Sequence, residues 1–275
     1  MERLLQAFNN SHKAAALIPF LVAGDPTFDL SLSMFETLVR GPADIVEIGI
    51  PYSDPLADGP VIQASALRSL RSNFQLPRAF EMTRELRAKT SKGLVLFTYM
   101  NPVYQYTPSR FFADAAEAGA DGAIIPDLPF EESALVRAEA DKHGVALIPL
   151  IAPTSSESRI AAIVEKARGF VYCVAALGVT GERAKMAANV SQLVETARRY
   201  TQLPIAVGFG VSSAEQAKQT ASFADGVIVG SAFIRRLEQA LPASAAEPAE
   251  KLTLIDAVDS FAEELASGLT LSSRP

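Results

Sequence analysis

The sequence predicts an α/β fold, a (β/α)₈ or TIM barrel in which eight parallel strands close into a ring and helices cover its outside. Short apolar runs alternate along the chain with segments of helical periodicity, as parallel strands covered by helices require. Eight such runs are present, and 275 residues with 49% hydrophobic content suit one barrel of this kind. A doubly wound open sheet would show the same alternation, but eight units in this length favour closure.

Each predicted strand is a short apolar run followed by a turn. The strands cover residues 17–22, 44–48, 94–99, 122–125, 145–150, 170–174, 205–208 and 226–229. The helices between them cover residues 30–39, 61–69, 78–89, 109–118, 132–142, 157–167, 189–200 and 214–221. An extra N-terminal helix over residues 1–8 would cover the bottom of the barrel, and a C-terminal helix over 252–265 follows an Ala/Pro/Glu-rich linker at 242–250. We therefore expect a single domain over 1–275, with its core at about 14–240 and a linker, final helix and frayed tail over 241–275.

Local signals mark where several of these elements begin. Ser212 with Glu215, and Thr154 with Glu157, have capping-box spacing, in which a hydroxyl and a carboxylate bind the free N–H groups of a helix start. A helix-ending glycine precedes several strands, in Arg-Gly-Pro-Ala-Asp at 40–44, Ala-Gly-Ala-Asp at 118–121 and His-Gly-Val at 143–145, and Phe-Ala-Asp-Gly at 223–226 is similar. This weak internal repeat of about one βα unit is typical of a barrel.

Composition excludes several classes of function. The 25 basic residues are interspersed among 31 acidic ones, so no basic stripe is available for nucleic acid. Cys173, His12 and His143 cannot assemble a Cys/His cluster, so we expect no metal site, and nothing in the sequence supports carboxylate-bound Mg²⁺. Apolar runs such as 14–23 and 144–152 fall short of the roughly 20 residues that span a membrane, and the protein is expected to be cytoplasmic.

One predicted strand ends on an unexpected charge. Glu47 stands near the C-terminal end of the otherwise apolar strand at 44–48, and barrel enzymes carry their reacting groups at such ends. Burial without a partner would be costly or would raise the pKa of this carboxyl group. The alternative interpretation is a carboxylate that merely accepts hydrogen bonds from a neighbouring strand or loop.

The loop after this strand contains a second carboxylate. Asp58 lies eleven positions after Glu47, beside the same strand end and just before a predicted helix, so the two can flank one ligand. The alternative for Asp58 is a helix N-cap or a turn aspartate before Gly-Pro. For Asp54 we prefer a turn role before proline or a surface contact.

Two glycine-containing strand ends predict a phosphate site. Gly-Phe-Gly at 208–210 ends the seventh strand, Gly-Ser at 230–231 ends the eighth, and each precedes a helix start. Glycine lets backbone N–H groups approach an anion, and the helix dipole adds favourable potential. Because phosphate sites of barrels usually follow strands seven and eight, we expect phosphate to bind here without a lysine.

The sixth strand leads into a long loop over 175–183 that is bounded by glycine, which favours a lid that closes over a ligand; an ordinary surface loop is the alternative. Tyr172 precedes this loop and can present its hydroxyl to the site, although a half-buried strand tyrosine is ordinary core material. Cys173 is expected to be a small core residue, because no histidine is placed to activate it.

Four segments carry a resemblance to a known family. The most specific is the continuous string Glu-Ile-Gly-Ile-Pro-Tyr-Ser-Asp-Pro-Leu-Ala-Asp-Gly-Pro at 47–60. The others are Pro-Phe-Leu-Val-Ala-Gly-Asp-Pro at 19–26, Gly-Val-Thr-Gly at 178–181 and Gly-Phe-Gly-Val at 208–211. Together they resemble tryptophan synthase alpha subunits over about residues 1–240. The resemblance implies retro-aldol cleavage of indole-3-glycerol phosphate to indole and glyceraldehyde 3-phosphate, in the last steps of tryptophan biosynthesis.

The resemblance also implies roles for individual residues. Glu47 would be the general acid/base that protonates the indole ring carbon, and Asp58 would stabilise the positive charge that develops at the ring nitrogen. An elevated pKa in a dry pocket suits the first role, whereas the second requires an ionised carboxylate. The implied substrate-binding residues are Phe20, Phe97, Ile124, Tyr172, Thr180, Gly181, Phe209, Gly210, Gly230 and Ser231.

A partner protein is implied as well. Indole would pass to a beta subunit that holds pyridoxal phosphate, in an α₂β₂ heterotetramer, so no cofactor is expected in this chain. The surface that resembles the family's contact with the beta subunit includes Asp54, Pro55 and the loop Tyr99-Met100-Asn101-Pro102. One departure is Ala-Ala-Leu at 175–177, where many relatives have a serine and other polar residues, and this puts lid closure or its coupling to the partner in doubt.

Three other functions stay open. A stand-alone indole-releasing lyase would keep Glu47 and Asp58 and work without a partner. A non-catalytic subunit that senses phosphorylated metabolites would bind without turnover, although the presence of both carboxylates argues against it. Another phosphate-binding barrel enzyme, such as an isomerase or aldolase, is the third; a Schiff-base aldolase needs a strand lysine, and none of the eight predicted strands contains one.

Overall fold

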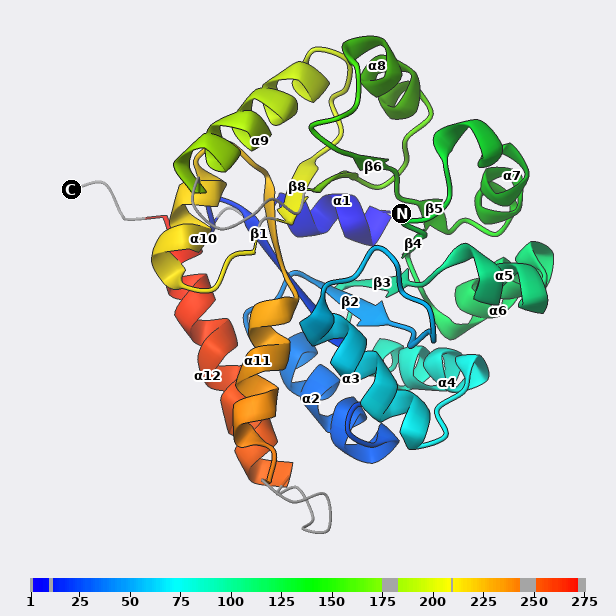
Figure 1. Ribbon diagram of the computed structural model, residues 1–275, viewed down its shortest axis with the longest axis vertical. Helices are drawn as coiled ribbons and strands as arrows, with labels where there is room; N and C mark the ends of the chain where they lie inside the picture. Colours follow the sequence, from blue (N-terminus) through cyan, green and yellow to red (C-terminus); the bar gives the residue numbers. More distant parts are fainter. Residues whose placement is uncertain (1, 10–11, 175–182, 209, 243–250, 272–275) are drawn as a thin grey trace.

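The computed structural model describes residues 2–9, 12–174, 183–208, 210–242 and 251–271. In this part of the chain nine parallel strands form one sheet in the order β5-β4-β3-β2-β1-β9-β8-β7-β6, and helices surround it (Figure 1). The strands are β1 (Ala16–Val22), β2 (Ile45–Gly49), β3 (Gly93–Phe97), β4 (Gly122–Ile124), β5 (Ala146–Leu147), β6 (Leu150–Ile151), β7 (Val171–Val174), β8 (Ile205–Gly208) and β9 (Gly226–Val229).

The sheet closes into a ring through its two end strands. β5 and β6 are two halves of one chain segment, separated only by Ile148 and Pro149. The Ile148 N–H donates to the Ala123 carbonyl of β4 at 2.9 Å, and the Pro149 carbonyl accepts the Tyr172 N–H of β7 at 2.9 Å. The eight-stranded barrel is therefore confirmed. The predicted fifth strand is divided because Pro149 has no N–H to donate to a ladder.

The predicted helices are present in the described residues, and two more, over residues 100–106 and 231–240, lie outside the predicted ranges, although the sequence predicts a helix start after Gly-Ser at 230–231. The helices are α1 (Glu2–Phe8), α2 (Phe28–Arg40), α3 (Pro60–Arg71), α4 (Leu76–Arg87), α5 (Met100–Tyr106), α6 (Pro108–Ala118), the 3₁₀ turn η1 (Phe130–Glu132), α7 (Ala134–Lys142), α8 (Glu157–Glu165), α9 (Arg183–Arg198), α10 (Ala214–Ala221), α11 (Ser231–Ala240) and α12 (Lys251–Leu269). α5 is absent from the prediction, because Asn-Pro at 101–102 is typical of a loop; Pro102 is tolerated in the first turn, where no N–H is needed. Within the described ranges, no helix has the length and hydropathy that crossing a bilayer demands.

Both predicted capping boxes are wrong by one or two residues. Ser156 rather than Thr154 caps α8, and its hydroxyl accepts the Arg159 N–H. Ser213 caps α10 by accepting the Gln216 N–H, whereas Ser212 hydrogen-bonds to the side chain of that glutamine. Neighbouring hydroxyl residues offer several cap candidates, and the helix starts where its apolar face meets the core, which the local spacing does not reveal.

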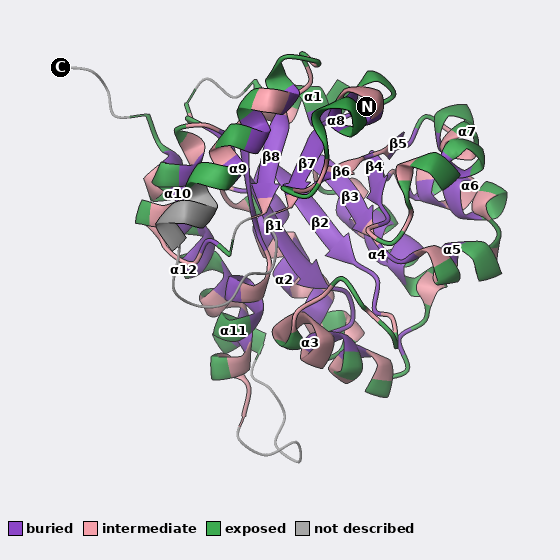
Figure 2. Ribbon diagram, turned by 45° about the horizontal axis from the view of Figure 1, so that its top comes forward, coloured by how far each residue is buried: buried purple, intermediate pink, exposed green. Residues whose placement is uncertain are grey.

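The core has an interior layer inside the barrel and an outer layer between strands and helices (Figure 2). α1 closes the bottom of the interior, as predicted. Leu4 is fully buried there, and the Phe8 ring lies 5.4 Å from that of Phe170. A Cβ atom on Gly226 would come within 2.8 Å of Phe8, so this glycine makes room for the helix.

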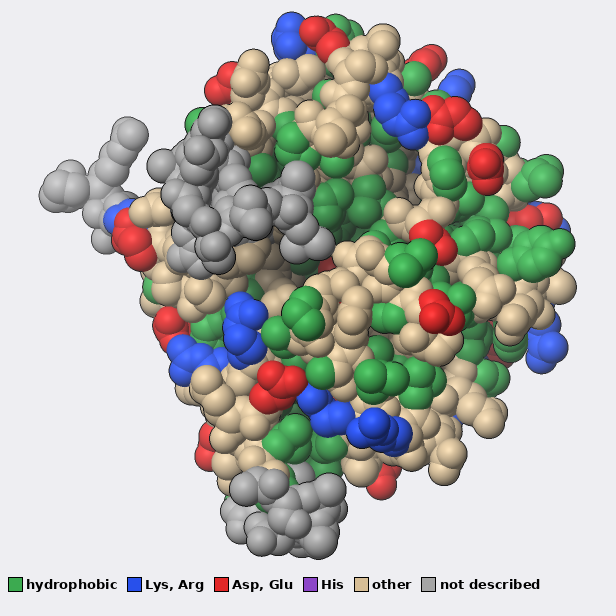
Figure 3. Space-filling model, viewed as in Figure 1, with side chains coloured by type: hydrophobic (Ala, Val, Ile, Leu, Met, Phe, Trp, Pro, Cys, Tyr) green, Lys and Arg blue, Asp and Glu red, His purple; other side chains and the backbone are tan. Residues whose placement is uncertain are grey.

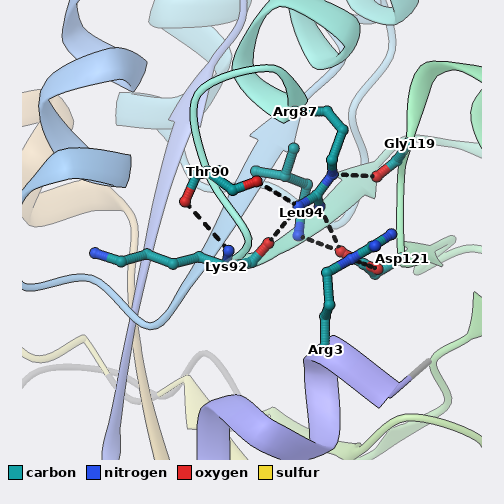
Figure 4. Close-up of polar contacts among 7 residues, drawn as sticks. All are labelled: Arg3, Arg87, Thr90, Lys92, Leu94, Gly119 and Asp121. Atoms are coloured by element: carbon teal, nitrogen blue, oxygen red, sulfur yellow. Dashed lines mark hydrogen bonds and ion pairs between the residues drawn. The ribbon is translucent and has the colours of Figure 1, made fainter.

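An aspartate explains the repeated segment before three of the strands. Asp121, which is 1% exposed, precedes β4 and accepts the N–H of Leu94, the second residue of the adjacent β3, at 3.0 Å. The guanidinium groups of Arg3 and Arg87 each donate to the same carboxylate at 2.7 Å (Figure 4). Charged donors and a buried backbone N–H therefore satisfy both carboxylate oxygens.

The same arrangement recurs at two other strand starts. Asp44 precedes β2 and accepts the Leu17 N–H of β1 at 2.8 Å. Asp225 precedes β9 and accepts the Ile205 N–H of β8 at 2.8 Å. Each of these aspartates also pairs with a cation. The repeat thus ties neighbouring strands together at the N-terminal end of the barrel, opposite the end where reacting groups are expected.

Candidate active site

Glu47 lies in β2 at the C-terminal end of the barrel, in register with Phe20 of β1 and Val95 of β3. It is 1% exposed, and in the described part of the chain neither carboxylate oxygen has a hydrogen-bond partner. Burial raises the pKa of this carboxyl group from 4.5 to about 8. The interpretation of Glu47 as a mere acceptor of structural hydrogen bonds is therefore wrong. Near neutral pH this raised pKa favours the protonated acid, and none of the described residues hydrogen-bonds to it.

Asp58 approaches the same strand end from the loop between β2 and α3. The Tyr99 hydroxyl donates to Asp58 Oδ2 at 2.8 Å. Burial raises the pKa of Asp58 from 3.8 to about 6, and the Tyr99 hydrogen bond opposes this rise. The carboxylate does not cap α3, because Gly59 is the N-cap and no side-chain cap bond is formed there. At neutral pH Asp58 is thus mostly ionised beside an acid that is mostly protonated.

Tyr172 reaches the same space from β7. It is buried, and a Cβ atom on Gly208 would come within 2.8 Å of its hydroxyl oxygen, so the side chain lies over β8. Burial raises the pKa of Tyr172 well above its ordinary value, and the nearby charges of Glu47 and Asp58 raise it further. The tyrosine therefore stays protonated, and its hydroxyl can donate to a ligand.

Apolar side chains form a wall beside these polar groups. The Phe20 and Phe97 rings meet edge to face with centroids 5.4 Å apart, and Ile124 pairs with Phe97 across β3 and β4. Gly49 permits this arrangement, since a Cβ atom there would come within 2.6 Å of the Phe20 ring. A flat apolar ligand would find dispersion contacts on one side and carboxyl groups on the other. Phe209, predicted for the same wall, lies outside the described residues.

Three predicted phosphate contacts lie at the ends of β8 and β9. Gly210 has φ +65°, and an added Cβ atom would meet nothing within 4 Å, so its backbone borders open space. Gly230 is the N-cap of α11 and Ser231 its first residue, and no side chain caps this helix start. Uncapped N–H groups at a helix N-terminus favour an anion. Thr180 and Gly181, together with the departure at 175–177, lie outside the described residues.

Tyr99 is a site residue that sequence reasoning placed only on the surface expected to meet the partner. It follows β3, is 3% exposed, and receives the Ala57 N–H at 3.2 Å on its hydroxyl while donating to Asp58. Its ring also lies 5.3 Å from that of Tyr52. Burial, and the Asp58 charge and hydrogen bond, raise the pKa of Tyr99, so it remains the donor in this pair. The only sequence signal is its place at a strand end.

Of the residues predicted to meet a partner, Asp54 and Pro55 lie in the loop between β2 and α3, and Asn101 and Pro102 lie in the first turn of α5. Asn101 is exposed, and its side-chain amide donates to the Tyr52 hydroxyl at 3.1 Å, which joins α5 to that loop. Large apolar side chains lie nearby, with Leu56 91% and Tyr104 72% exposed. Cys173 is a buried free thiol whose pKa is raised to about 12 by burial, as expected of a core residue rather than a nucleophile.

Known proteins similar to this chain share one description. The family profile described as tryptophan synthase alpha chain matches residues 6–266. The chain is 49% identical over 230 residues to the tryptophan synthase alpha chain of Synechococcus elongatus, covering 83% of this chain and 86% of that protein. It is 44% identical over 253 residues to the tryptophan synthase alpha chain of Geobacillus kaustophilus, and the match covers 92% of this chain and 94% of that protein.

Solved structures agree with these sequence relatives. A chain of Mycobacterium tuberculosis tryptophan synthase superposes with a TM-score of 0.86 at 36% identity, covering 98% of this chain and 99% of that one. The tryptophan synthase alpha chain from Legionella pneumophila gives a TM-score of 0.84 at 34% identity, and the match covers 98% of this chain and 97% of that one.

Proposed function

Because the chain belongs to the tryptophan synthase alpha chain family, it is a lyase that cleaves indole-3-glycerol phosphate in tryptophan biosynthesis, and we propose that Glu47 and Asp58 perform this cleavage. The observation that carries the assignment is the burial of Glu47 without a hydrogen-bond partner in the described part of the chain. A pKa of about 8 keeps a proton on this group near neutral pH. Protonation of an indole carbon needs such an acid.

The cleavage begins with transfer of the Glu47 proton to the ring carbon that bears the glycerol chain. The ring nitrogen then carries a positive charge, and the ring becomes an electron acceptor. The hydroxyl proton on the adjacent side-chain carbon returns to the ionised Glu47 carboxylate, the carbon–carbon bond breaks, and its electron pair restores the aromatic indole. The products are indole and glyceraldehyde 3-phosphate, and Glu47 ends the cycle protonated.

Asp58 stabilises the intermediate charge. With a pKa of about 6 it is mostly ionised at neutral pH, and the Tyr99 hydroxyl fixes one of its oxygens at 2.8 Å. A negative charge held where positive charge develops lowers the barrier more than it stabilises the neutral substrate. The two carboxyl groups thus have different protonation states because Glu47 is buried without donors, whereas Asp58 is partly exposed and accepts one hydrogen bond.

The remaining contacts orient the substrate. Phe20, Phe97 and Ile124 hold the indole ring, and the Tyr172 hydroxyl faces it from β7. The phosphate binds at the uncapped start of α11, with contacts from Gly210, Gly230 and Ser231. Holding both ends of the substrate places the ring carbon against Glu47. Thr180, Gly181 and Phe209 are assigned to the same substrate on the family resemblance alone.

The family implies a beta subunit as the partner of this chain. We propose an α₂β₂ complex in the cytoplasm, in which this chain contacts the beta subunit through Asp54 and Pro55 of the β2–α3 loop and through Asn101 and Pro102 of α5. The exposed Leu56 and Tyr104 beside these residues support an interface, because such side chains gain most from being covered. The cleavage itself needs only a proton donor and a fixed charge, which supports a chain without a cofactor and pyridoxal phosphate in the partner.

The test follows indole release from indole-3-glycerol phosphate by the purified chain, alone and with a tryptophan synthase beta subunit. We expect slow release alone, stimulation by the partner, and near-complete loss in both Glu47→Gln and Asp58→Asn. Glu117→Gln, an exposed site on α6, is the matched control and should keep wild-type rates. Full activity in either Glu47→Gln or Asp58→Asn would refute the assigned roles. Fast release that the partner does not stimulate would instead identify a stand-alone lyase.

A further inference from the structure

A cavity lies between α7 and α8, toward the C-terminal ends of β4, β6 and β7, and two of its lining residues, Leu150 and Val174, pack on the barrel interior. It has a volume of about 580 Å³, within the range of small-molecule sites, and Glu47, Asp58 and Tyr172 are not among its lining residues. α7 packs against α6, and α8 packs against α9, while the two helices diverge from each other (Figure 1). The divided fifth strand, with Pro149 between its halves, forms the floor. We call this space the α7–α8 cavity.

The floor and sides of the cavity are apolar because two parts of the outer core end there. Leu147 packs on the core cluster on the α7 side, whereas Ile151 and Ile163 belong to the cluster on the α8 side. Phe130 of η1 forms part of the rim. Phe130 packs on the cluster on the α8 side, and the Arg159–Glu131 ion pair joins α8 to η1. The cavity still leaves apolar surface on which a ligand would gain dispersion contacts.

The polar groups on the walls are mainly basic. The ionisable residues that line the cavity are Arg137, Arg159, Lys166 and Asp127, although the chain as a whole carries a net charge of −6. The Asp127 carboxylate accepts the Met100 N–H at 2.8 Å. Basic and acidic side chains lie together where α8 faces α7 on the surface (Figure 3). The local excess of positive charge favours an anion.

Arg137 is the cation best placed for a ligand. Its guanidinium group lies 5.1 Å over the Phe130 ring and donates to the Ser133 hydroxyl, which fixes its orientation. No carboxylate pairs with it among the described residues, whereas Arg159 is held by both oxygens of Glu131. A half-buried guanidinium with free N–H groups matches the two oxygens of a carboxylate.

We propose that the α7–α8 cavity is a binding site for a small amphipathic carboxylate. The apolar body of the ligand lies on Leu147, Ile151 and Ile163, and its carboxylate accepts hydrogen bonds from Arg137 with Lys166 close by. One carboxylate balances the charge that Arg137 leaves unpaired, and the apolar body fills space that water would occupy poorly. The contacts proposed here, Arg137 and the outer-core side chains, are different residues from those assigned to cleavage, and the proposal does not depend on that assignment.

The test uses para-trifluoromethylbenzoate as the probe and fluorine NMR as the readout. The full chain carries Glu47→Gln and is saturated with indole-3-glycerol phosphate, so that the cleavage site is occupied and no turnover occurs. We expect saturable binding of one probe per chain, and binding at least about tenfold weaker for the neutral methyl ester. Arg137→Met should weaken binding by about tenfold or more, while Arg84→Met, an exposed arginine on α4, should not.

Lys166→Met provides a second test in case Arg137→Met does not fold, because Lys166 is exposed and its loss leaves the packing of Phe130 intact. A smaller but measurable loss of affinity in this variant supports the proposal even if Arg137→Met unfolds. Absence of saturable binding, equal affinity for the acid and its ester, or binding that occurs only when indole-3-glycerol phosphate is omitted would overturn it.

Discussion

Glu47→Gln is expected to stabilise the fold while it abolishes turnover. The wild-type carboxyl group is buried without a hydrogen-bond partner in the described part of the chain, and burial raises its pKa from 4.5 to about 8. Glutamine has nearly the same shape and is also polar, but it cannot ionise. The two proteins therefore differ in their dependence on pH more than in their packing.

The sign and size of the effect follow from proton binding. Below pH 4.5 the carboxyl group is protonated in both the folded and the unfolded chain, so it adds no pH dependence. Between pH 4.5 and about 8 the unfolded chain releases the proton and the folded chain keeps it, and the free energy of unfolding falls by about 1.4 kcal/mol per pH unit. The loss is about 3 kcal/mol at pH 7 and about 5 kcal/mol above pH 8.

Urea unfolding followed by circular dichroism measures this difference between about pH 5 and about pH 9. The stability advantage of Glu47→Gln over the wild type should grow steadily over that range and level off above about pH 8. Glu117→Gln, whose side chain is 76% exposed, should show no such trend. A constant difference between wild type and Glu47→Gln would refute the reasoning, because it would mean that Glu47 ionises in the folded chain near its ordinary pKa.

Three further predictions concern Asp58, its hydrogen-bond donor Tyr99, and the aspartates at the starts of the strands. The kcat/KM profile for indole release should rise through about pH 6 as Asp58 ionises and fall through about pH 8 as Glu47 loses its proton. Asp58→Asn should lower turnover by about 10²-fold or more and remove the rise near pH 6, which is the acidic limb of the profile. An acidic limb that this variant leaves unchanged would contradict the assignment. Tyr99→Phe removes a hydrogen bond that lowers the pKa of Asp58, so the acidic limb should move to higher pH while the rate near pH 8 changes little; a uniform loss at all pH values would indicate a structural role instead. In urea unfolding, Asp121→Ala should cost about 3–5 kcal/mol because it leaves buried donors unpaired, whereas Asp225→Ala, at a site 32% exposed, should cost about 1 kcal/mol, and equal losses would refute this ranking.

Most of the barrel could be predicted because its strands are buried on both faces. Every residue of β1 is buried, so the strand is a continuous apolar run that the sequence displays directly. The break in the fifth strand has a local cause in Pro149, but whether that proline ends the strand or only interrupts it depends on hydrogen bonds to two neighbours. Cap positions at Ser156 and Ser213 depend likewise on which turn of the helix meets the core.

The candidate site was predictable where a residue type conflicts with its surroundings. Glu47 is conspicuous as a charge in an apolar strand, and Asp58 follows it in the next loop. Tyr99 has no such conflict, because a tyrosine at a strand end is as typical of a core as of a site. It lies 41 positions from Asp58, and only the curvature of the barrel brings the two together.

The two ends of the barrel explain why equally buried carboxyl groups have opposite effects. Asp121 and Glu47 are both 1% exposed. Asp121 lies at the N-terminal end, where parallel strands begin with free N–H groups, and it accepts one such group and two arginines. Glu47 lies toward the C-terminal end, where the last residues of parallel strands present carbonyl oxygens, which are acceptors like itself. Donors stabilise the carboxylate of Asp121, whereas none of the described residues donates to Glu47, although Asp58 accepts a hydrogen bond at the same end and is mostly ionised. Glu47 is therefore favoured as a protonated acid that can donate its proton to a ligand.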